Sequence, residues 1–243
     1  MVSSHTNFYQ SNNNPIDLNC PHFEEQEALN EFVKQNNKTA IFDFCLIKMM
    51  LGVYFDQYEA VFKFRKMAKE NISARTGSVV TMFFYFFDSL LLLNSNGGQI
   101  GKSGNQIMRT VVHNQKILLK RAKINPGNFM NKYYLVEAEK NRFKKNYALA
   151  ESFYEKSLNY AATSGFIQEE ALAKEYYAKL YIEKNAKRIA EILLQECLDL
   201  YDKWKAFNKK KQLLDLYPDL IKENVLYAKG HSENVLSFKN KVF

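Results

Sequence analysis

Two stretches decide the fold: residues 138–157 read AEKNRFKKNYALAESFYEKS, and residues 178–197 read AKLYIEKNAKRIAEILLQEC. The matched positions are Ala138 with Ala178, Ala150 with Ala190, Tyr154 with Leu194, and Ser157 with Cys197. Small residues let two helices approach closely, and the large residue fills the gap to the next pair. The pattern predicts hairpins of the tetratricopeptide type, irregular because the spacing of the two stretches exceeds the standard period of about 34 residues.

Apolar residues recur at helical spacing on both sides of these stretches. The chain holds only 9 Gly and 4 Pro, too few turn signals for a sandwich or a barrel. Helices are expected at residues 23–35, 40–55, 58–70, 78–93, 105–122, 128–143, 147–163, 168–183, 187–206 and 209–217. We therefore predict an all-α fold, a right-handed α-solenoid of TPR-like helical hairpins.

Three segments are expected along the chain. Residues 1–20 are rich in Asn and Ser and predict a flexible leader, residues 21–222 form the TPR-like repeat domain, and residues 223–243 form a C-terminal tail. An apolar content of 47% is enough for a continuous core.

The composition favours a cytoplasmic protein. The three cysteines, Cys20, Cys45 and Cys197, lie far apart, which argues against a disulfide framework and for a reducing compartment. The N-terminus lacks the basic start and apolar run of a secretory signal. Residues 79–93 are the most apolar stretch, but they include Asp88 and fall short of the roughly 20 residues of a membrane span, so they predict a buried helix.

The net charge of +8 comes without a long block of one sign, so the excess of positive charge is expected to be spread thinly along the chain.

Several short motifs carry a resemblance to a known family. They are residues 87–90 (FDSL), 114–116 (NQK), 128–139 with the core KYYLVEAE, 170–173 (EALA), Tyr201, Trp204, 217–218 (YP) and Leu220. Their order and spacing over residues 40–222 resemble the helical segment of large multidomain signalling kinases. Those kinases join a serine/threonine kinase-like domain, an AAA/STAND-type ATPase domain, helical repeats, a GAF domain and a sensor histidine kinase.

The resemblance implies a regulatory relay that contacts neighbouring signalling domains or another protein. The chain departs from the family at Lys205, where the family has Gly after the Trp, so the helix is expected to end differently there. It also continues into residues 226–243 in place of a GAF domain, and so resembles a detached or truncated piece.

No motif predicts catalysis, a cofactor or a metal. Residues 96–103 (NGGQIGKS) differ from a phosphate loop at Asn96 and follow a predicted helix, whereas a phosphate loop follows a strand. Cys20 and His22 supply two ligands where a zinc site needs four. We therefore expect a protein that is not an enzyme.

The candidate binding site is a surface. A solenoid presents a concave face built from the first helix of each hairpin, which makes Tyr133, Glu137, Lys174 and Tyr181 candidate protein-binding residues. Uncovered end repeats would also promote self-association.

An alternative function lies in a basic cluster near the C-terminus. It consists of Lys203, Lys205, Lys209, Lys210 and Lys211. Lysines can contact nucleic-acid phosphates, and the interspersed Tyr201 and Trp204 could stack on bases, as in a nucleic-acid-associated regulator. The repeat interpretation has these aromatic residues closing the last hairpin, with the lysines solvated.

Overall fold

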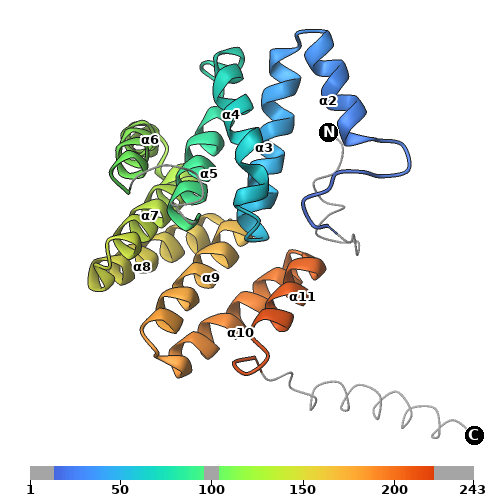
Figure 1. Ribbon diagram of the computed structural model, residues 1–243. Coiled ribbons are helices and arrows are strands. Elements are labelled where there is room, and N and C mark those ends of the chain that lie inside the picture. The colour runs from blue at the N-terminus through green and yellow to red at the C-terminus, as the bar shows by residue number, and fades with distance from the viewer. Residues whose placement is uncertain (1–13, 96–103, 222–243) are drawn as a thin grey trace, which may run out of the picture.

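The computed structural model describes residues 14–95 and 104–221 (Figure 1). Within these residues the fold is all-α, as predicted. The α-helices are α2 (Glu25–Lys34), α3 (Lys38–Tyr54), α4 (Phe62–Asn71), α5 (Val80–Asn94), α6 (Gly104–Ile124), α7 (Pro126–Phe143), α8 (Tyr147–Ser164), α9 (Ile167–Glu183), α10 (Lys187–Lys203) and α11 (Phe207–Leu216). Short 3-10 helices span Glu59–Val61 and Ile72–Arg75. Each predicted helix is present, and the boundaries lie close to those expected.

Consecutive helices pack in pairs. α3 packs on α4, α5 on α6, α7 on α8 and α9 on α10, and the first helices of these pairs contact one another in the order α3, α5, α7, α9. In Figure 1 the chain passes from α2 and α3 at the upper right, through α5 to α8 at the left, to α9, α10 and α11 at the lower right. The predicted helical hairpins are therefore present as pairwise packing.

The repeat in the sequence is also a repeat in the packing. Helices α8 to α11 begin at equal intervals, at positions 147, 167, 187 and 207. The Ser157 hydroxyl donates a hydrogen bond to the Asn131 carbonyl (2.8 Å). At the matched position of the next hairpin, the Cys197 thiol donates to the Ala171 carbonyl (3.3 Å). The small matched side chains thus link the two helices of each hairpin in the same way.

The turns repeat with the helices. Lys145, Gly165, Asn185 and Lys205 are equally spaced along the chain, and all have positive φ, between 58° and 73°. At each turn the following amide closes the helix end; the Ala206 N–H, for example, donates to a carbonyl of α10 at 2.8 Å. This left-handed closure is the Schellman motif. It ends α10 at residue 203, so the predicted end at residue 206 was wrong, because Lys205 adopts a left-handed conformation.

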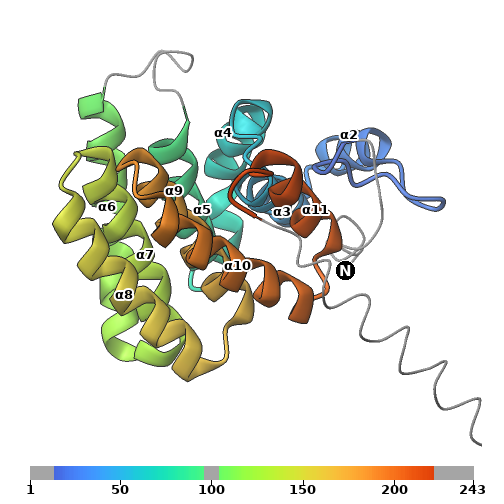
Figure 2. The same ribbon diagram turned by 90° about the horizontal axis from the view of Figure 1, so that it is seen from below.

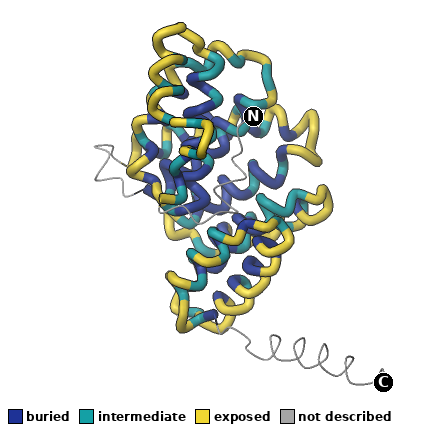
Figure 3. The backbone as a smooth tube through the Cα atoms, turned by 90° about the vertical axis from the view of Figure 1, so that its right-hand side faces the viewer, coloured by how far each residue is buried: buried dark blue, intermediate teal, exposed yellow. Residues whose placement is uncertain are grey.

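The core lies along the inner faces of the hairpins (Figure 3). Residues 79–93 were expected to form a buried helix, and α5 confirms this: Phe84, Phe86 and Phe87 of its aromatic run are buried, and Phe83 and Tyr85 are half-buried. Across the described ranges, no helix combines the length and the apolar character that crossing a membrane requires.

Replacing Lys205 by Gly should raise the free energy of unfolding by about 1 kcal/mol, because a side chain in the left-handed region carries a steric cost that Gly avoids. Gln195→Gly, at an exposed position inside α10, is the matched control and should lower the free energy of unfolding by about 1 kcal/mol. Urea denaturation measures both. A loss of stability in Lys205→Gly comparable to that of the control would contradict the assigned turn.

Candidate functional site

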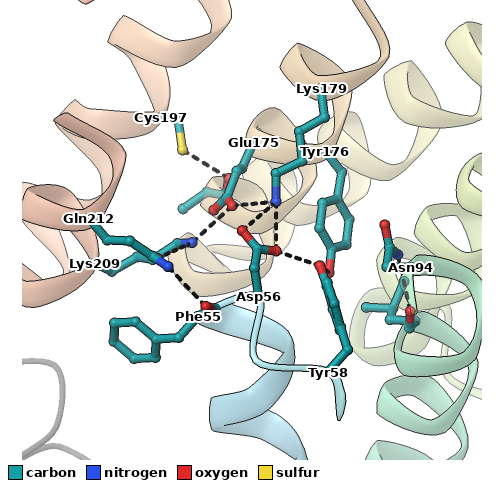
Figure 4. A network of polar contacts seen from close by, with 12 residues as sticks. Phe55, Asp56, Tyr58, Asn94, Glu175, Tyr176, Lys179, Cys197, Lys209 and Gln212 are labelled. Atoms are coloured by element: carbon teal, nitrogen blue, oxygen red, sulfur yellow. Dashed lines mark hydrogen bonds and ion pairs between the residues drawn. The ribbon is translucent and has the colours of Figure 1, made fainter. Parts of the chain in front are cut away.

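A group of charged side chains, two buried and two half-buried, joins the end of α3 to α9 and α11 (Figure 4). It consists of Asp56, Glu175, Lys179 and Lys209, here called the junction network. The Lys179 Nζ atom lies 2.8 and 2.9 Å from the two carboxylate oxygens of Asp56 and 2.9 Å from Glu175 Oε1. Lys209 Nζ lies 2.9 Å from the same Glu175 oxygen. Two cations and two anions therefore form one neutral cluster.

Further hydrogen bonds surround the junction network. The Tyr201 hydroxyl donates to Glu175 Oε2 (2.7 Å), and the Tyr58 hydroxyl donates to Asp56. Gln212 of α11 donates through Nε2 to the Phe55 carbonyl (2.9 Å), although 157 positions separate the two residues. Beside the network, the rings of Tyr54 and Trp204 pack with centroids 5.3 Å apart. Segments from opposite ends of the described chain are thereby held together.

The electrostatic environment favours the charged forms of Asp56 and Lys179. Burial raises the pKa of Asp56, but the ammonium groups of Lys179 and Lys209 outweigh it and lower that pKa to about 2. For Lys179, burial lowers the pKa, and the carboxylates of Asp56 and Glu175 raise it well above its usual range. Removing one member would leave the cluster with an uncompensated charge, which is costly in a medium of low polarity.

Local structure explains the placement of each group. Asp56 follows α3 at φ +56°, a left-handed conformation that short polar side chains tolerate. Glu175 and Lys179 are one helical turn apart and share one face of α9. Lys209 lies in the first turn of α11. Sequence reasoning missed this cluster, because charges spaced by one helical turn are also typical of solvated helix faces.

A second polar site surrounds Arg142, in a cavity of about 500 Å³ between the ends of α5, α7 and α9. The guanidinium group lies 2.7 Å from a Glu183 oxygen and 3.0 Å from a Glu139 oxygen. The Tyr154 hydroxyl also donates to Glu139. Burial lowers the pKa of Arg142, and its two carboxylate neighbours raise it by more, so the group stays charged. The arrangement cross-links three helices.

The candidate protein-binding residues lie on two helices, α7 and α9. On α7, the Glu137 side chain and the Tyr133 carbonyl both accept hydrogen bonds from Gln115 of α6 (2.8 and 3.0 Å). Glu137 is only 8% exposed, so the expectation that it lies at an exposed position was wrong. On α9, Lys174 forms an ion pair with Glu196 of α10 (2.6 Å). Tyr181 is half-buried and shares a hydroxyl contact of 3.3 Å with Tyr177.

The predicted basic cluster is divided by the fold. Lys209 is fully buried in the junction network, so the expectation that it is solvated was wrong: its partner Glu175 lies 34 positions away, on another helix. Lys210 pairs with Asp202 (2.9 Å). Lys203, Lys205 and Lys211 are exposed. Tyr201 is fully buried and packs on Trp204, consistent with a role in closing the last hairpin.

Residues 96–103, which resemble a phosphate loop, lie outside the described residues. No cluster of three or more His, Cys, Asp or Glu side chains suited to a metal ion occurs in residues 14–95 and 104–221.

Comparison with known proteins gives no match: no family model, no curated protein and no solved structure is significantly similar to the chain. The resemblance to the helical segment of signalling kinases therefore remains a prediction based on the motifs quoted above.

Replacing Asp56 by Asn should lower the free energy of unfolding by about 1.5–3 kcal/mol, because Lys179 would lose one of its two counter-charges. Asp202→Asn removes an exposed ion pair and should cost less than about 1 kcal/mol. Chemical denaturation compares the two variants. Equal losses would contradict the role of the junction network.

The contribution of Asp56 to stability should also depend on pH. The pKa of Asp56 is about 2 in the folded chain, below its ordinary value of 3.8, so its stabilising effect is complete above about pH 4 and disappears as the pH falls through 2. The stability difference between the natural chain and Asp56→Asn should narrow over that window.

Proposed function

We propose that this chain is a non-catalytic protein-interaction module, built as a short right-handed α-solenoid of TPR-like hairpins. The architecture is supported by the equal spacing of the helix starts from α8 to α11, by left-handed turns with the same spacing, and by the serial contacts of α3, α5, α7 and α9. In a solenoid each repeat contacts only its neighbours, which leaves extended surfaces for partners.

One observation carries the functional proposal: apolar side chains recur on the outer surface at equivalent positions of successive hairpins. Leu149 of α8 is 55% exposed, and Ile189, at the equivalent position of α10, is 44% exposed. Ile192, on the next turn of α10, is 53% exposed. Single exposed apolar residues are common on protein surfaces, but recurrence in register is a feature of contact surfaces.

The distribution of charges supports a role without catalysis. Glu175 and Glu139, both buried, are bound to basic groups and to tyrosine hydroxyls that fasten helices together. These carboxylates serve packing and are not free to act as acids or bases.

The partner in this proposal is another protein or a neighbouring domain of a signalling assembly, as the resemblance to multidomain sensor kinases implies. Self-association through the end repeat is a related mode, because Phe207 and Leu216 of α11 are both about half exposed. We propose a cytoplasmic location, since Cys20, Cys45 and Cys197 are all free thiols.

Replacing Leu149 and Ile189 by Asp should abolish partner binding while leaving the fold intact, because both side chains point to solvent. Val33→Asp with Val79→Asp, two exposed apolar residues at the other end of the chain, is the matched control. Affinity purification from the source cells, quantified by mass spectrometry, should recover a stoichiometric protein with the natural chain and with the control. Recovery should fall at least tenfold with the α8/α10 variant.

Two results would contradict the proposal. One is equal recovery with both variants, and the other is the absence of any stoichiometric partner. Circular dichroism and thermal melts of all three proteins first establish that the substitutions leave the helices folded.

A further inference from the structure

Helix α6 has an unusual charge composition. Its 21 residues include Arg109, Lys116, Lys120, Arg121 and Lys123 but no Asp or Glu. These five cations are a large part of the net charge of +8 of the whole chain. The excess charge is therefore concentrated on one helix.

The fold arranges most of these cations in a straight row. Arg109, Lys116, Lys120 and Lys123 are exposed and, together with exposed His113, follow one another at alternating steps of four and three positions. This spacing keeps side chains on one face of an α-helix. The row, here called the α6 stripe, extends for about 21 Å, given a rise of about 1.5 Å per residue.

The opposite face of α6 is attached to the rest of the protein. Ile107, Val111, Asn114, Leu118 and Ala122 are buried there, and α6 packs on α5 and α7. Figures 1 and 2 show α6 at the edge of the molecule, on the side away from α11. The α6 stripe is thus held on a fixed element and is distant from the C-terminal lysines.

The cations of the α6 stripe have no acidic residue on their own helix. Arg109, Lys116, Lys120 and Lys123 form no ion pair with any residue in the two described ranges. On α10, by contrast, acidic residues are interspersed among the basic ones. A row of unpaired cations produces a positive potential that attracts a linear polyanion.

We propose that the α6 stripe binds the phosphodiester backbone of a nucleic acid, independently of base sequence. Three features favour this partner. Phosphates supply charges in a line, as the stripe does, whereas an anionic membrane presents a plane. Charge alone gives nucleic-acid affinity, while a stable protein interface needs about 800 Å² on each partner, far more than a row about 21 Å long and about 10 Å wide. Finally, α6 contains no Phe, Tyr or Trp on which bases could stack.

The test is binding of a labelled 20-base-pair duplex DNA of arbitrary sequence, measured by fluorescence anisotropy at several KCl concentrations. Counter-ion release by the four Lys and Arg side chains of the α6 stripe predicts an affinity that falls roughly 150-fold between about 50 and 200 mM salt. Arg109→Gln/Lys116→Gln/Lys120→Gln should reduce that fall to roughly fourfold and weaken binding at about 50 mM. The control, Lys63→Gln/Lys66→Gln/Lys69→Gln, removes the same charge from exposed positions of α4 and should leave both quantities nearly unchanged.

Each remaining outcome decides for or against the proposal. Equal losses in the two triple variants would show that net charge alone attracts DNA. Tighter binding to poly-glutamate of matched length would assign the stripe to an acidic protein, and preferential binding to phosphatidylserine vesicles would assign it to a membrane. Similar affinity for a second DNA sequence and for duplex RNA would support recognition of the backbone.

Discussion

The junction of Asp56, Lys179, Glu175 and Lys209 is the constraint on which the rest of the structure depends. Their charges balance. Glu175 and Lys209 are fully buried, and Lys179 and Asp56 are mostly shielded from water, so removing any one of them leaves an uncompensated charge at a cost in free energy. Because Asp56 ends α3 while the other three belong to α9 and α11, the series of hairpins must curve until its first and last parts meet. The inner side of α9 is consequently covered by the protein's own chain, and little of it remains for a partner.

Local patterns were enough to predict the elements of the fold. The spacing of Ala150, Tyr154 and Ser157, repeated at positions 190, 194 and 197, correctly identified the hairpins because helix pairing within a repeat involves near neighbours in sequence. The end of α10 was missed because Lys205 takes a conformation that propensity assigns to Gly.

Local sequence patterns could not predict contacts between residues that are distant in the sequence. Lys209 is adjacent in sequence to exposed lysines and differs from them only through Glu175, on another helix. Glu137 likewise reads as a surface residue until Gln115 of α6 is placed beside it. The α6 stripe was hidden for a related reason: its cations are separated by neutral residues, so the sequence shows no block of one sign, whereas the helical turn aligns them.

The proposed contacts lie on the outer surfaces of α6, α8 and α10, and the packed interior maintains the spacing of these helices.

Native-state hydrogen exchange, followed by mass spectrometry, tests most directly whether the junction makes the described chain a single cooperative unit. The amides of α3, α9 and α11 should then exchange with similar free energies of opening, because separating any of these helices breaks the same cluster of charges. Exchange of α10 and α11 at a free energy several kcal/mol below that of α3 would contradict this, and would indicate repeats that unfold independently from one end.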